Sequence, residues 1–154
     1  MTVACYCESC QKAGHHLETL LDAPAILVGD GGTHFVMFRK DRVRCLDGKE
    51  HLREHRLKPG SATRRVVAQC CNSPMFLEFE KGHWLSLYKD RFATDDQPPL
   101  DMRTMTMDRR PEVNFNDGIP SPKKHTTRFM WNLMKAWAVM GFRTPKINYV
   151  NGKI

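Results

Sequence analysis

The segment CYCESC at residues 5–10 carries three cysteines, Cys5, Cys7 and Cys10. Thiolates bind zinc at about 2.3 Å, and zinc lowers the pKa of a coordinating thiol so that the thiol binds deprotonated. A C-x-C-x-x-C run can place three sulfurs around one ion if the backbone turns tightly. Tetrahedral zinc takes four ligands, so the chemistry depends on whether a fourth protein ligand closes the site or leaves that position open.

Four other residues are candidates for the fourth ligand: Cys70, Cys71, His15 and His16. Adjacent cysteines on a strand point to opposite faces, so at most one of Cys70 and Cys71 should face the metal. The simpler interpretation of the two histidines is that they are surface residues of a short helix and do not bind the metal. A disulfide between Cys70 and Cys71 would be strained, which argues against a redox role for this pair.

The composition places the chain among ordinary globular proteins. Its 154 residues fit one domain, and 41% of them are hydrophobic. Six cysteines are too few for a disulfide scaffold, and in a reducing compartment clustered cysteines are typical of metal binding or chemistry. No apolar run approaches the roughly 18 residues that a membrane span requires, and no secretory signal is visible, so we expect a cytoplasmic protein.

The net charge of +7 is concentrated toward the end of the chain. Residues 1–100 contain 14 basic and 13 acidic side chains, whereas residues 101–154 contain 10 basic and 4 acidic ones. A basic surface can attract nucleic acid, an acidic membrane or an anionic substrate. Because no stacking aromatics or arginine-rich repeats accompany this charge, we expect a solvated basic surface and no nucleic-acid partner.

The first part of the chain has the pattern of a small antiparallel sheet. A short helix or helical turn is predicted at 11–21, after the cysteine cluster. Short runs of β-branched, aromatic and alternating residues, separated by turn signals, predict strands at 33–39, 43–48, 51–57, 64–70, 75–80 and 83–88. Cys45 is interpreted as a core or strand cysteine. These features predict a mostly-β zinc-binding domain over residues 1–92.

Residues 93–154 should form an extended arm followed by one C-terminal α-helix, packed on the same domain. The arm is rich in Pro, Asp and Gly between residues 92 and 122. The helix is predicted at 126–142, where apolar residues cover more than one face. Such a helix should be well buried, either on the sheet or in the interface of a homodimer.

Two segments resemble motifs of a known family. CYCESCQKAG resembles the C-x-C-x-x-C-[RQ]-K motif of the glutathione-dependent formaldehyde-activating enzyme family, which also contains centromere protein V. VAQCCNSPMF is similar to the F-C-x-x-C-G-[ST]-P-L-F motif of that family. The resemblance covers roughly residues 1–92 and implies a zinc-bearing fold of β-tent-like antiparallel sheets.

Family members usually hold a structural zinc and a catalytic zinc, and the resemblance implies that Cys5, Cys7 and Cys10 hold the catalytic ion with an open fourth position. The structural site needs an upstream C-x-C, which this chain lacks, and a CxxC, in which Ala68 replaces the first cysteine and Cys71 fits the second. We therefore expect one zinc per chain. We also expect the first strand of the family fold to be missing and the C-terminal helix to cover the exposed sheet edge.

The resemblance implies a carbon–sulfur lyase that joins a thiol, such as glutathione, to a small aldehyde at an open zinc with three cysteine ligands. Lys12 could contact a substrate carboxylate, and His15 or His16 could act as a general base. A solvated Lys12 is the simpler interpretation. The alternative function is a non-catalytic binding module, in which Cys71 or Cys70 closes a four-cysteine site and the basic C-terminal third forms the contact surface.

Overall fold

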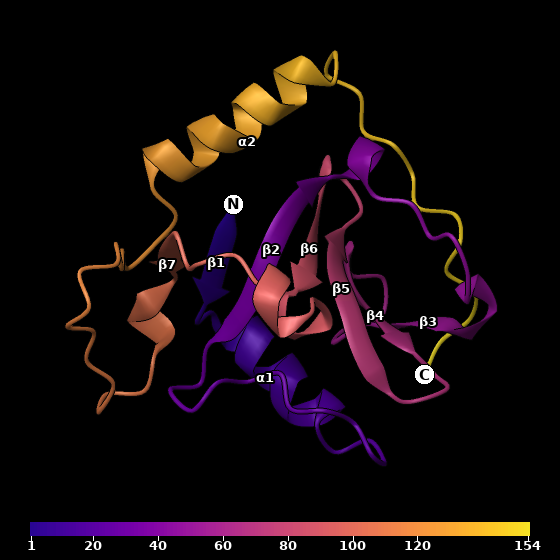
Figure 1. Cartoon of the computed structure of the whole chain (residues 1–154), viewed down its shortest axis with the longest axis horizontal. Coiled ribbons are helices and arrows are strands. Elements are labelled where there is room, and N and C mark those ends of the chain that lie inside the picture. The colour runs from indigo at the N-terminus through magenta and orange to yellow at the C-terminus, as the bar shows by residue number, and fades with distance from the viewer.

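The computed structural model describes residues 1–154 and has one seven-stranded sheet with two α-helices (Figure 1). Helical residues, with five short 3-10 helices included, and strand residues each make up about 25% of the chain. The helices are α1 (Glu8–Leu17) and α2 (Thr127–Val139). The strands are β1 (Thr2–Cys5), β2 (Thr33–Arg39), β3 (Leu52–His55), β4 (Thr63–Ala68), β5 (Ser73–Phe79), β6 (Trp84–Tyr88) and β7 (Met102–Thr104).

The strand order is β3-β4-β5-β6-β2-β1-β7, and the sheet is mixed. All neighbouring strands run antiparallel except β1 and β7, which are parallel. The predicted antiparallel arrangement therefore holds for every neighbouring pair of strands except the β1–β7 pair at this edge. The C-terminal helix also does not replace a strand there, because β1 pairs with β2 on one side and with β7 on the other.

Most predicted strands occur within a few residues of their expected bounds. The prediction at 33–39 matches β2, and those at 51–57, 64–70, 75–80 and 83–88 correspond to β3, β4, β5 and β6. The strand predicted at 43–48 does not form, because this segment follows a 3-10 turn and ends at Gly48 with a φ of 72°. Cys45 consequently lies in a loop, half-buried, where its thiol donates to the Asp47 carbonyl at 3.1 Å.

The two faces of the sheet carry different layers. On β4, Val67 belongs to a cluster with Cys10 and Leu17 of α1, whereas Val66 belongs to a cluster with Leu52 and Phe76. Successive side chains of a strand alternate between faces, so α1 covers one face of this part of the sheet. The C-terminal segment, including Ile147, Tyr149 and Val150, packs against the other face.

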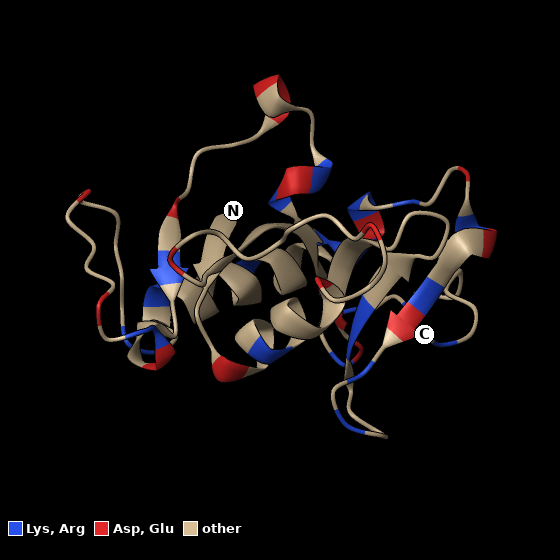
Figure 2. Ribbon diagram, turned by 90° about the horizontal axis from the view of Figure 1, so that it is seen from below, with Lys and Arg blue, Asp and Glu red and all other residues tan.

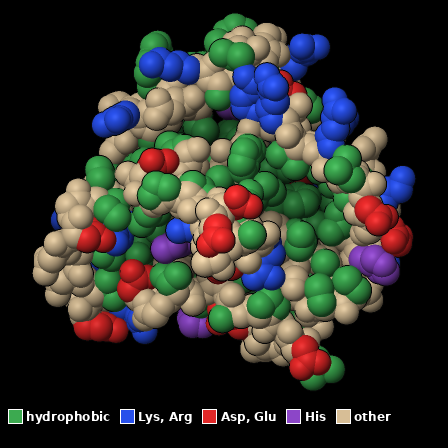
Figure 3. Space-filling view, in the orientation of Figure 1, with side chains coloured by type: hydrophobic (Ala, Val, Ile, Leu, Met, Phe, Trp, Pro, Cys, Tyr) green, Lys and Arg blue, Asp and Glu red, His purple; other side chains and the backbone are tan.

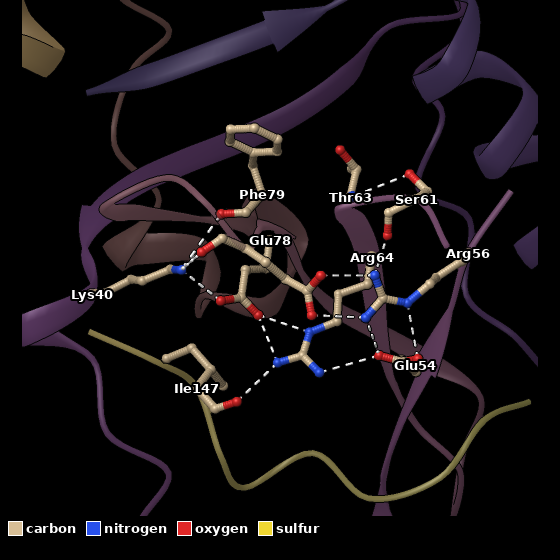
Figure 4. A network of polar contacts seen from close by, with 10 residues as sticks. Lys40, Glu54, Arg56, Ser61, Thr63, Arg64, Glu78, Phe79 and Ile147 are labelled. Atoms are coloured by element: carbon tan, nitrogen blue, oxygen red, sulfur yellow. Dashed lines mark hydrogen bonds and ion pairs between the residues drawn. The ribbon is translucent and has the colours of Figure 1, made fainter. Parts of the chain in front are cut away.

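A buried network of charges crosses the second face (Figure 4). Glu78 of β5 is only 1% exposed, and it accepts from Lys40 at 2.6 Å and from Arg64 at 2.7 Å. Arg64 also donates to the Ile147 carbonyl at 3.0 Å, and Arg56 bridges Glu54 and Glu80 at 2.7 and 2.8 Å. The network ties β3, β4 and β5 to the C-terminal segment. Each buried charge of this network has a partner of opposite charge, as low-polarity surroundings require.

Helix α2 begins with a capping hydrogen bond, in which the Thr126 hydroxyl accepts from the Phe129 amide at 3.1 Å. Phe129 and Leu133 are buried against Val3 of β1. The expectation of a well-buried helix is only half met, since Trp131 is 60% exposed. Other exposed apolar residues on or just after this helix are Met130, Met134, Val139 and Phe142. Neither helix is both long and apolar enough to cross a membrane.

The arm between β6 and α2 is ordered by contacts with the sheet, and residues 105–120 project on the left in Figures 1 and 2. Arg103 of β7 pairs with Asp117 at 2.6 Å, and its guanidinium lies 4.1 Å from the centre of the Phe115 ring. Phe115 also packs on the Tyr6 ring, with ring centres 5.2 Å apart. The arm thus folds back onto the residues that surround the cysteine cluster.

Candidate metal centre

The three clustered cysteines lie where β1 ends and α1 begins. Cys5 is the last residue of β1, where it pairs with Thr33 of β2 and Thr104 of β7. Cys7 is the N-cap residue of α1, and its carbonyl accepts from the Cys10 amide at 2.9 Å. Cys10 lies three residues later, in the first turn of the helix, and therefore on the side of the N-cap residue. The strand-to-helix junction brings all three thiols together.

Hydrogen bonds from distant segments fix this junction. The Tyr6 side chain is fully buried, and its hydroxyl donates to Asp30 at 2.7 Å. The Gln11 amide donates to the carbonyls of Tyr6 and Asp108, and the Asp108 carboxylate accepts from the Glu8 amide at 3.3 Å. The turn is thus held by the loop before β2 and by the arm after β7. Its shape does not depend on a bound ion alone.

The geometry of the thiols fits one metal ion. The sulfurs of Cys5, Cys7 and Cys10 all lie within 4.8 Å of one another. Around a tetrahedral zinc with bonds of about 2.3 Å, sulfurs stand about 3.8 Å apart, so small side-chain rotations complete the fit. No carboxylate, imidazole or further thiol joins this group. Cys10 is buried, whereas Cys5 and Cys7 are half-buried, so the cluster is not fully enclosed.

The three thiols share one negative charge. Hydrogen bonds from Cys10 and then Cys5 to the Cys7 sulfur lower the pKa of Cys7 to about 2. For Cys5, the hydrogen bond from Cys10 lowers the pKa. The hydrogen bond that Cys5 donates to Cys7, together with the burial of Cys5, outweighs this effect and raises the pKa of Cys5 to about 12. Hydrogen bonding to Cys5 and Cys7, together with burial, raises the pKa of Cys10 well above its usual value. The metal-free site therefore holds one thiolate and two thiols at neutral pH.

A buried arginine, Arg65, contacts the first turn of α1 beside the cysteine cluster. Arg65 of β4 is 2% exposed and forms no ion pair, and its guanidinium donates to the Ser9 carbonyl at 2.9 Å. Tyr88 is buried near both Cys10 and Arg65. Burial and then the Cys10 charge raise the pKa of Tyr88, whereas the Arg65 charge lowers it. A positive charge without a carboxylate partner is thus held at the first turn of α1, the turn that carries Cys10.

The three residues predicted for substrate binding, Lys12, His15 and His16, are all exposed on α1. Lys12 is exposed and pairs with Glu8 at 2.6 Å, so the solvated interpretation fits this residue. His15 and His16 are exposed in the last turn of the helix, and neither joins the thiol group. His16 stacks on His55 of β3, with ring centres 4.4 Å apart.

The structure does not bring the remaining cysteines to the cluster. Cys70 and Cys71 are exposed in the turn between β4 and β5, with their sulfurs 3.8 Å apart. The strand predicted at 64–70 ends at Ala68, so the alternation argument does not apply to this pair. Cys71 hydrogen-bonds with the Ser73 hydroxyl at 3.2 Å, and Cys45 lies among residues of the other sheet face.

Arg65 and the anchoring residues Tyr6, Gln11 and Asp108 were not found by sequence reasoning. Arg64 and Arg65 are consecutive in a strand that is buried on both faces, and that unusual pair was the available signal for a buried charge near the site. The contacts of Gln11 and Asp108 span 97 residues, and no local pattern encodes them.

Comparisons with protein-family models, curated proteins and solved structures found no match for this chain. The resemblance to the formaldehyde-activating family therefore rests on the two quoted motifs and remains a prediction.

Proposed function

We propose that the chain is a zinc-binding protein whose Cys5, Cys7 and Cys10 hold one ion and leave its fourth position to solvent or substrate. The observation that carries the proposal is the convergence of three sulfurs, without a fourth protein ligand, at a preformed strand-to-helix junction. Thiolate ligands in a tetrahedral arrangement favour zinc among the common cellular metals. The buried charge of Arg65 would offset the net negative charge of three thiolates around a divalent ion.

For this site we propose carbon–sulfur bond formation between a thiol of the glutathione type and a small aldehyde. When bound, zinc would hold the substrate thiol as thiolate and polarise the aldehyde carbonyl. The thiol sulfur adds to the carbonyl carbon, and the proton lost from sulfur ends on the carbonyl oxygen, so the product is a hemithioacetal. Arg65 fixes the Ser9 carbonyl and so positions the first turn of α1.

The test compares two cysteine variants prepared under reducing conditions. Cys10→Ser removes the buried ligand, whereas Cys45→Ser is a control for loss of a half-buried thiol elsewhere. Metal analysis of the purified proteins should find one zinc per chain in the wild type and in Cys45→Ser, and little in Cys10→Ser. Formation of hemithioacetal from glutathione and formaldehyde, followed by NMR exchange, should show the same order. A wild-type protein without zinc would refute the metal site, and a zinc-loaded protein that does not accelerate the exchange would refute the reaction.

A second candidate function is supported by the position of Cys7 and Cys10. A CxxC pair with a half-buried cysteine at a helix N-terminus and a buried cysteine in the first turn suits thiol–disulfide exchange. In that case oxidation by a small disulfide would produce one internal disulfide and two reduced small thiols. Mass spectrometry of the zinc-free protein after treatment with oxidised glutathione tests this candidate. A stable disulfide between Cys7 and Cys10 supports exchange chemistry, and two cysteines that stay reduced would exclude it.

The alternative of a closed, non-catalytic module requires Cys70 or Cys71 as a fourth sulfur ligand of the metal. Both residues lie in the exposed turn between β4 and β5, and neither sulfur joins the group formed by the three clustered thiols. A four-sulfur site combined with a basic C-terminal contact surface is therefore the function that this geometry favours least.

A further inference from the structure

A pocket lies on the face of the sheet opposite the cysteine cluster. An apolar pocket of about 410 Å³ is lined by 15 residues, 10 of them hydrophobic. Its strand walls are Leu52, Phe76 and Leu87, and the C-terminal segment adds Tyr149. Figure 3 shows hydrophobic side chains gathered in a hollow to the right of centre. The volume falls within the roughly 300–1,000 Å³ typical of small-molecule sites.

The polar part of the lining is mainly basic. Arg44, Arg91 and His51 line the pocket, and Asp47 is the one acidic residue among its lining residues. Asp47 already accepts from the Gly48 amide at 2.9 Å. Neither arginine forms an ion pair or a side-chain hydrogen bond, and the Nε atom of Arg91 is buried without a partner. A buried donor left unsatisfied is costly, so its presence beside an apolar pocket indicates a missing acceptor.

We propose that this pocket binds a small apolar molecule that ends in a carboxylate, such as a medium-chain fatty acid. The strand and loop side chains would cover the hydrocarbon chain, whose burial drives binding. Arg91 would receive the carboxylate, because a guanidinium presents paired donors that match two carboxylate oxygens. The site is independent of the proposed zinc chemistry, since none of its lining residues belongs to the cysteine trio.

The test uses octanoate and octanol, which share a hydrocarbon chain but differ in the charged end. Isothermal titration calorimetry of the wild-type protein should give saturable 1:1 binding of octanoate, and weaker binding of octanol. Arg91→Met should weaken octanoate binding by about 10- to 100-fold, the range expected for a hydrogen bond to a charged group, and leave octanol binding nearly unchanged. Arg128→Met, at an exposed arginine on α2, is the matched control and should bind both ligands like the wild type.

A second variant tests the position of the hydrocarbon chain. Met75 lines the pocket and is only partly buried, so Met75→Trp should fill the space and abolish binding of both ligands. Far-UV circular dichroism establishes that each variant is folded. Absence of octanoate binding to the wild-type protein would overturn the proposal. So would an equal loss of both ligands in Arg91→Met, or unchanged binding in a folded Met75→Trp.

Discussion

The protonation state of the cysteine cluster predicts how zinc affinity changes with pH. In the metal-free protein, Cys7 has a pKa of about 2 and is already a thiolate at neutral pH. Cys5 has a pKa of about 12, and the pKa of Cys10 is raised well above its usual value, so both remain protonated. Zinc binds thiolates and must displace about two protons. The apparent affinity should therefore rise about 100-fold for each pH unit between about pH 6 and pH 8.

Competition with a chromophoric chelator, corrected for the titration of the chelator itself, measures this slope. The control Cys45→Ser should keep a slope of about two in the logarithm of affinity against pH, because Cys45 lies outside the cluster. Cys10→Ser should bind zinc more weakly and with a slope of about one, because one fewer proton is displaced. A slope of about three would show that Cys7 is protonated in the metal-free protein, and a slope near zero would show that the thiols are not the ligands. Either result would refute the reasoning.

Three further predictions concern stability and assembly. Glu78→Gln should lower the free energy of unfolding by about 3–5 kcal/mol in urea denaturation, since it leaves Lys40 buried without a full countercharge; a loss below about 1 kcal/mol would contradict this. Deletion of residues 147–154 should destabilise the domain, because this segment pairs with β3 and covers its face of the sheet; an unchanged urea midpoint would argue against that role. We also propose that the exposed apolar face of α2 mediates a homodimer, so sedimentation equilibrium should give a dimer for the wild type and a monomer for Trp131→Glu, and a monomeric wild type at high concentration would contradict it.

The central strands could be predicted because their sequences carry the pattern of the sheet. The run at 33–39 and the runs that became β4, β5 and β6 are rich in β-branched or aromatic residues and are bounded by turn signals. Strands β1 and β7 have four and three residues, too few to show a period. Their existence depends on pairing with each other and with β2, which is a long-range property.

The candidate metal site could be predicted only in part. The spacing of Cys5, Cys7 and Cys10 was enough to identify the cluster, because residues this close in sequence need only one local turn to meet. Spacing says nothing about which strand lies across from that turn, so Arg65 could not be assigned to the site. It also could not show that Cys71 lies in an exposed turn away from the cluster.

The burial of α2 illustrates a similar limit. Its apolar residues cover more than one face, and the sequence cannot tell which face meets the sheet. In the structure Phe129 and Leu133 are covered, whereas Trp131 remains 60% exposed.

Zinc-edge X-ray absorption of the purified protein tests the central claim most directly, because it counts the sulfurs around the metal. An open site at Cys5, Cys7 and Cys10 predicts three sulfurs at about 2.3 Å and one lighter ligand at about 2.0 Å. Four sulfurs would mean that another cysteine closes the site, and would contradict an open position for substrate.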